Sequence, residues 1–133
     1  MTWQPGHAFE PASYDVRRSD LVRYAGASGD FNPIHWSDRV ATSVGLPGVI
    51  AHGMYTLALA GNAVVGWVGD PAAVLSLGAR FTKPVIVPDD DSGTTVTVAG
   101  VVKSVVDGVA TIDLTVTNAG QKVLGMSKAT VRC

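Results

Sequence analysis

Cysteine is almost absent from this chain of 133 residues, and its single copy, Cys133, is the last residue. One cysteine cannot form an internal disulfide, so nothing in the sequence points to an oxidising compartment. The N-terminus, MTWQPG, lacks the basic start and the apolar core of a signal peptide. We therefore expect a cytoplasmic protein.

Charge of one sign and long apolar runs are also scarce. Ten basic residues stand against eleven acidic ones, the formal net charge is −1, and the longest run of like charge is Asp89, Asp90 and Asp91. A surface for nucleic acid needs a basic patch, so we exclude this class of partner. The most apolar stretch, residues 54–68, is shorter than the roughly 18 to 20 residues that span a bilayer, so we expect no membrane partner.

What the chain has is apolar surface. Hydrophobic residues make up 47% of the sequence, and the mean hydropathy is +0.26. A chain of this length typically forms one unit that buries most of its apolar surface, so we predict one domain over residues 1–133. The apolar surplus favours contact with another subunit, and a homodimer is the default because most oligomers contain copies of one chain.

The N-terminal half carries signals for helices. Ser19 and Asp20 can cap a short helix that runs through Tyr24, and Ser37 can cap a second helix that stops at Gly45. After a Pro-Gly turn, residues 49–68 are apolar on nearly every face, which predicts a long and wholly enclosed helix.

The C-terminal half is rich in valine and threonine, which favours strands. Asp107-Gly108 is a strong hairpin signal, and residues 118–120 mark a second turn, so sequential strands should pair antiparallel in a meander. The predicted fold class is α+β, with a curled antiparallel sheet wrapped around the enclosed helix. The expected strands are residues 74–87, 94–106, 109–117 and 122–132.

Between the two short helices lies a polar segment that can carry chemistry. Asp30 and His35 lie five positions apart across Asn32-Pro33, and the proline keeps this segment out of a regular helix. Proton transfer in both directions needs such a carboxylate and imidazole. Ordinary turn chemistry explains the same residues: Asn32 either orients the pair or closes its own turn, and Ser28 either caps an amide near the pair or ends the preceding helix.

The start of the long helix, Ala51-His52-Gly53-Met54, is a second candidate. The first turn of a helix has free N–H groups and the positive end of the dipole, which attract an oxyanion. Glycine at position 53 would let a carbonyl oxygen approach the backbone closely. The alternative is that Gly53 only permits tight packing of helix against sheet.

The segments that contain these residues resemble the signature of the MaoC-like (R)-specific enoyl-CoA hydratases and (3R)-hydroxyacyl-ACP dehydratases, above all the mycobacterial dehydratases. The resemblance implies a hot-dog fold, catalytic Asp30 and His35, and a Gly53 amide that faces the thioester carbonyl. It also implies dimers that pair their sheets edge to edge, with a heterodimer of related subunits as a second possibility. The matching runs are YAGASGDFNPIH (24–35) with Ala41 beyond it, IAHGM (50–54), WVGDP (67–71) and RFT (80–82).

The expected reaction is the reversible hydration of trans-2-enoyl thioesters, or dehydration of (3R)-3-hydroxyacyl thioesters, carried on coenzyme A or acyl carrier protein. His52, Met54 and Arg80 are candidates for binding or orienting the substrate, and Arg80 with Lys83 suits the phosphates of the carrier. No cofactor is required. No metal is expected, because the histidines lack the spacing of well-known sites.

Two other functions compete with this one. A non-catalytic partner subunit, which would hold an acyl chain for another protein, is expected to lack the Asp30–His35 pair. A hot-dog thioesterase would carry its nucleophile or base on the enclosed helix, where Thr56 and Asn62 are the main polar side chains.

Overall fold

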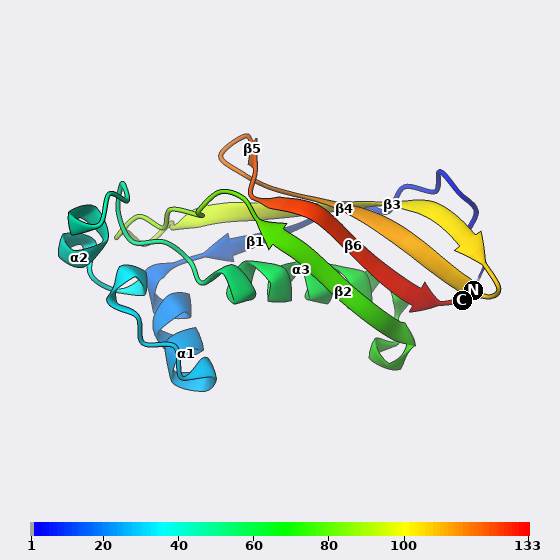
Figure 1. Ribbon diagram of the computed structural model, residues 1–133, viewed down its shortest axis with the longest axis horizontal. Helices are drawn as coiled ribbons and strands as arrows, with labels where there is room; N and C mark the ends of the chain where they lie inside the picture. Colours follow the sequence, from blue (N-terminus) through cyan, green and yellow to red (C-terminus); the bar gives the residue numbers. More distant parts are fainter. Residues whose placement is uncertain (1) are drawn as a thin grey trace.

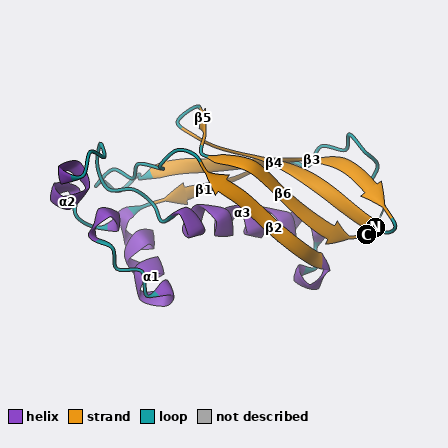
Figure 2. Ribbon diagram, viewed as in Figure 1, coloured by secondary structure: helices purple, strands orange, loops and turns teal. Residues whose placement is uncertain are grey.

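The computed structural model describes residues 2–133, with one long helix lying along one face of an antiparallel sheet (Figure 1, Figure 2). The strands are β1 (Ala12–Val16), β2 (Val74–Phe81), β3 (Thr94–Val106), β4 (Val109–Asn118), β5 (Gln121–Lys122) and β6 (Leu124–Arg132). The helices are α1 (Arg18–Ser28), α2 (Asp38–Ser43) and α3 (Gly53–Val68), with single 3-10 turns η1 (Pro33–His35) and η2 (Pro71–Ala73). The strands lie in the order β1-β3-β4-β6-β2, and β5 pairs with β4. The predicted α+β class is confirmed.

The core lies between α3 and the sheet. Alternate residues of the strands, such as Val98 in β3 and Ile112 in β4, are fully buried, as are Ala60 and Val64 of α3. The prediction of a wholly enclosed helix is wrong, because a stripe of residues four apart is exposed along α3. One sheet covers only part of the circumference of a helix, and small residues can lie on either the buried or the exposed side of that helix. The stripe consists of Met54, Ala58, Asn62 and Gly66.

Both turn predictions in the C-terminal half are confirmed. The hairpin of β3 and β4 closes at Asp107 and Gly108, whose φ angles of 52° and 75° match the left-handed residues of a two-residue hairpin loop. Ala119 and Gly120 have φ angles of 51° and 75° and connect β4 to β5.

The meander prediction is wrong for the first extended segment. β2 ends at Phe81 rather than at residue 87, and it pairs with β6 instead of β3. Pro84 and Pro88 cannot donate a backbone hydrogen bond to a strand ladder, so they favour the end of the strand. Residues 82–93 then carry the chain toward the opposite edge of the sheet. There β3 pairs with β1, a strand that the sequence did not predict because its five residues are mostly exposed or half-buried.

The helix limits also differ from those predicted. α1 starts at Arg18, because Asp20 caps it from inside the first turn by accepting the Arg17 N–H at 2.8 Å. It runs to Ser28, beyond the predicted Tyr24. The Ser37 cap is confirmed, with its Oγ accepting the Val40 N–H at 3.2 Å, although α2 ends at Ser43.

The long helix starts at Gly53, within the run 51–54 expected at its start, and not at residue 49, where the apolar stretch begins. Residues 49–51 are extended instead and pair with residues 85–87: the Ala51 N–H donates to Val85 O at 2.8 Å and the Val87 N–H to Val49 O at 3.0 Å. Within residues 2–133, none of the helices combines the length and the apolar character needed to cross a membrane.

Candidate active site

The loop that carries Asp30 is held by a series of side chains that bond to nearby backbone. Ser28 Oγ accepts the Asp30 N–H at 3.1 Å, Asp30 Oδ1 accepts the Asn32 N–H at 3.1 Å, and Asn32 Oδ1 accepts the Ile34 N–H at 3.2 Å. Ser28 therefore caps an amide next to the candidate acid, and Asn32 closes its own turn. Because its Oδ1 is bonded to the loop, Asp30 has Oδ2 left for other contacts.

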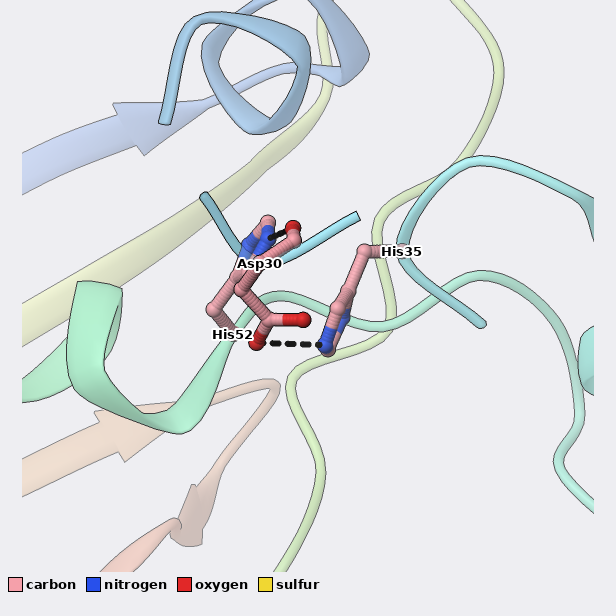
Figure 3. Close-up of side chains that lie close together, drawn as sticks. All are labelled: Asp30, His35 and His52. Carbon is pink, nitrogen blue, oxygen red and sulfur yellow. Dashed lines mark hydrogen bonds and ion pairs between the residues drawn. The ribbon is translucent and has the colours of Figure 1, made fainter. Parts of the chain in front are cut away.

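His35 is buried beside this loop, with a defined arrangement of its ring nitrogens (Figure 3). Its Nδ1 lies 2.7 Å from Ile50 O, and because a carbonyl only accepts, Nδ1 carries the proton. Nε2 is then the atom with a free lone pair, and it lies 3.8 Å from Asp30 Oδ2. This gap is too long for a direct hydrogen bond, but an oxygen atom beside it can lie within ~2.8 Å of both atoms. The Asp30 side chain is 51% exposed, so the pair is open to such an oxygen.

His52 connects the two candidate residues. It is only 2% exposed, its Nε2–H donates to Asp30 O at 3.1 Å, and its ring stacks on His35 with centroids 3.8 Å apart. Burial is the main cause that lowers the pKa of His52, and the neighbouring His35 lowers it further, while the bond to Asp30 O opposes them. A neutral His52 thus holds the Asp30 backbone and supports the face of His35.

The same three residues do not form a good metal site, although their potential ligand atoms lie within 4.8 Å of one another. A metal binds an imidazole nitrogen in the plane of the ring, at roughly 2.0–2.1 Å for zinc. The planes of His35 and His52 are stacked and only 21° apart, so they do not meet within that distance of both rings. His7 lies elsewhere, packed against Phe9.

A cavity of about 350 Å³ opens next to His35 and reaches the start of α3. Gly53 is the first residue of α3, where amides have no carbonyl of the helix to bond. A Cβ at this position would lie 3.1 Å from the Phe81 ring, so the glycine permits the close packing that was the alternative interpretation. Thr56, buried on the next turn of α3, is the polar side chain of this helix that faces the cavity. The walls include His35, Ile50, Gly53, Thr56, Phe81 and Lys83.

His35 and Gly53 line this cavity, but the other predicted site residues do not: its walls within residues 2–133 lack Asp30, Ser28, Asn32 and His52, as well as two more of the predicted substrate-binding residues. Among residues 2–133, its walls include neither Met54, which is exposed on α3, nor Arg80, which lies beside Lys128 in a surface hollow over β2 and β6. Neighbouring residues of a strand point to opposite faces, so Phe81 reaches the cavity where Arg80 does not. Phe81 was not predicted as a site residue. The alternation of strand residues within the matching RFT run (80–82) was a signal that could have identified it.

Comparison with known proteins identifies the family. The model of the MaoC like domain matches residues 2–121, so the chain belongs to the MaoC-like domain family. One curated relative, 3-hydroxyacyl-thioester dehydratase X of Mycobacterium tuberculosis, is 37% identical over 73 residues, which are 55% of this chain and 25% of the relative. The chain thus spans about a quarter of that relative's length. That residues 1–133 form a single domain stays a prediction.

Solved structures confirm the hot-dog fold. A MaoC-like dehydratase superposes with a TM-score of 0.94 at 36% identity, over 98% of this chain and 40% of that chain. The unliganded R-hydratase PhaJ1 from Pseudomonas aeruginosa superposes with a TM-score of 0.82 at 27% identity, over 98% and 82% of the two chains. A chain of the ChsH1-ChsH2 complex from Mycobacterium tuberculosis gives 0.81 at 25% identity, over 98% and 96%.

Proposed function

We propose that this protein catalyses the reversible hydration of trans-2-enoyl thioesters and the dehydration of (3R)-3-hydroxyacyl thioesters, with Asp30 and His35 as the acid/base pair. One observation carries the proposal: the free Nε2 of His35 faces Asp30 Oδ2 at 3.8 Å, and His35 lines a cavity whose walls also include Gly53, the first residue of α3. The names of the similar proteins, which include a dehydratase and an R-hydratase, support the reaction type and the (3R) stereochemistry.

The proposed reaction needs one group that accepts a proton and one that donates it. In dehydration one member of the pair takes the proton from C2, and the pair then delivers a proton to the C3 hydroxyl, which leaves as water; in hydration both steps reverse. An oxygen placed within reach of His35 Nε2 and Asp30 Oδ2 would be the substrate hydroxyl or the attacking water. Groups positioned in this way typically contribute 10²- to 10⁴-fold each to the rate.

The negative charge that develops on the thioester oxygen needs a donor. The Gly53 N–H is a candidate, because it lies at the positive end of the α3 dipole and on the cavity wall. Protein groups therefore supply the acid, the base and the oxyanion donor, and the proposed mechanism includes no metal and no organic cofactor.

The carrier of the acyl group is proposed to be coenzyme A or the phosphopantetheine arm of a carrier protein. Lys83 lies at the cavity and is the better placed cation for its phosphates, while Arg80 would serve only a carrier that extends over β2 and β6. We propose a dimer as the working form. A homodimer is the simplest case, and the similarity to a chain of the ChsH1-ChsH2 complex supports a heterodimer as the alternative.

The test is a spectrophotometric assay with crotonyl-CoA and a longer enoyl-CoA, in which hydration removes the absorbance of the conjugated double bond. We expect turnover, with the (3R)-hydroxyacyl product identified by chiral chromatography. Formation of the (3S) product, or release of free thiol instead of hydration, would contradict the proposal, and free thiol would favour the thioesterase.

A further inference from the structure

An ion pair outside the proposed active site holds backbone on which His35 depends. Arg18 lies in the first turn of α1 and Asp38 opens α2. The Arg18 Nη2 atom donates to Asp38 Oδ1 at 2.8 Å and to Oδ2 at 3.0 Å. The hydrogen bond from Arg18 is the main cause that lowers the pKa of Asp38, with the Val49 amide adding to it, so the carboxylate is ionised at neutral pH.

Both residues of the pair also bond to a backbone ribbon formed by residues 49–51 and 85–87. Arg18 Nε donates to Val87 O at 2.6 Å, and Asp38 Oδ1 accepts the Val49 N–H at 3.0 Å. Val49 and Val87 are hydrogen-bonded to each other as well. The ion pair thus clamps the two segments of the ribbon, residues 49–51 and 85–87, together at one end.

The hydrogen bonds of the ribbon connect the Arg18–Asp38 ion pair to His35. The Val49 carbonyl accepts the Val87 N–H and the Ala51 N–H donates to Val85 O, whereas Ile50 between them directs its own bonds to the other side. There the Ile50 N–H donates to Ile34 O at 3.1 Å, and Ile50 O accepts the His35 Nδ1–H at 2.7 Å. The carbonyl that selects the tautomer of His35 is therefore one residue away from the clamped amide of Val49.

We propose that Arg18 and Asp38 are positioning residues, which act through Val49 and Ile50 to keep His35 in the tautomer with a free Nε2. The kinetic part of this inference rests on the proposed function, because only turnover makes the tautomer matter for rate. The tautomer itself is a property of the protein without substrate. The bond made by one ring nitrogen decides which form is present, so a displaced Ile50 carbonyl changes the mixture.

The experiment compares Arg18→Met with Arg23→Met in the full chain. The substitution is the same and both arginines lie on α1, but within residues 2–133 the ion pair of Arg23 is with Asp20 alone, at 3.5 Å on the surface. Nitrogen-15 correlation spectra report the tautomer of His35, which is assigned by the loss of its signals in His35→Gln. Rates of enoyl-CoA hydration give kcat and KM separately, and Arg18→Lys tests for partial rescue.

We expect Arg18→Met to show a second His35 tautomer and a kcat about tenfold lower, with KM changed less than twofold. Arg23→Met should match the wild type, and Arg18→Lys should lie between them. His35 signals and kcat in folded Arg18→Met that equal those of Arg23→Met would overturn the inference. If Arg18→Met does not fold, Asp38→Asn replaces it under the same criteria, since an amide oxygen can still accept the Val49 N–H.

The two proposals fail in different ways. If the wild type hydrates no enoyl thioester, the proposed function fails, and the His35 spectra of the variants still decide the positioning role.

Discussion

Replacing Gly53 by alanine separates a packing role of this glycine from a role in binding the thioester oxygen. The added Cβ would lie 3.1 Å from three atoms of the Phe81 ring, so the ring must move by a few tenths of an ångström. Phe81 is 56% exposed and can move outward, so we expect a stability loss of about 1 kcal/mol or less, at the low end for overpacked sites. The methyl group would, however, occupy the approach of a carbonyl oxygen to the first amide of α3.

If the Gly53 N–H stabilises the developing oxyanion, kcat/KM should fall by about 10²-fold, or ~2.7 kcal/mol, which is the lower end for loss of one such donor. Gly61→Ala on the same helix is a matched control, because the added Cβ would lie 3.1 Å from the Leu77 side chain of β2. Chemical denaturation gives the stability of both variants, and crotonyl-CoA hydration gives the rates. A Gly53→Ala rate within about threefold of the Gly61→Ala rate would refute the oxyanion role.

Two further predictions concern stability. Because burial lowers the pKa of His52, the unfolded chain binds a proton near pH 6.5 that the folded chain does not. The contribution of His52 to the free energy of unfolding should therefore be fully present above pH 6.5 and should be lost as the pH drops toward the lowered pKa. In urea titrations, His52→Gln should make the free energy of unfolding depend less on pH. Equal pH dependence in the wild type and His52→Gln would contradict the reasoning. Gly100→Ala should cost about 1–3 kcal/mol, since its Cβ would lie 2.6 Å from the Trp67 ring, whereas Gly26→Ala on exposed α1 should be neutral or stabilising in thermal melts. A Gly100→Ala melting temperature equal to that of the wild type would show that Trp67 moves freely.

Features set by nearby residues could be predicted from the sequence. The Ser37 cap and the Asp107-Gly108 hairpin are confirmed, because side-chain oxygens and positive φ angles decide such structures locally. The pairing of β2 with β6 was not predictable in the same way. It joins segments about 50 residues apart, and the sequence shows the prolines that favour the end of β2 but not the place to which the chain then goes.

The candidate site shows the same division. The Asp30–His35 spacing indicated a pair, and the structure brings the two side chains to 3.8 Å. The stacking of His52 on His35 and the bond from His52 to Asp30 O link positions 17 and 22 residues apart, so no local pattern contains them. The Arg18–Asp38 clamp is equally nonlocal, since α1 and α2 meet only after the chain has folded around η1.

The most direct test of the central claim measures hydration of crotonyl-CoA by the wild type, Asp30→Asn and His35→Ala. These substitutions leave the cavity in place and remove one proton-transfer group each, so a rate at least ~10²-fold lower is predicted for both variants. Circular dichroism checks that each variant is folded. Hydration that persists at the wild-type rate in both folded variants would contradict the assignment of Asp30 and His35 as the acid/base pair.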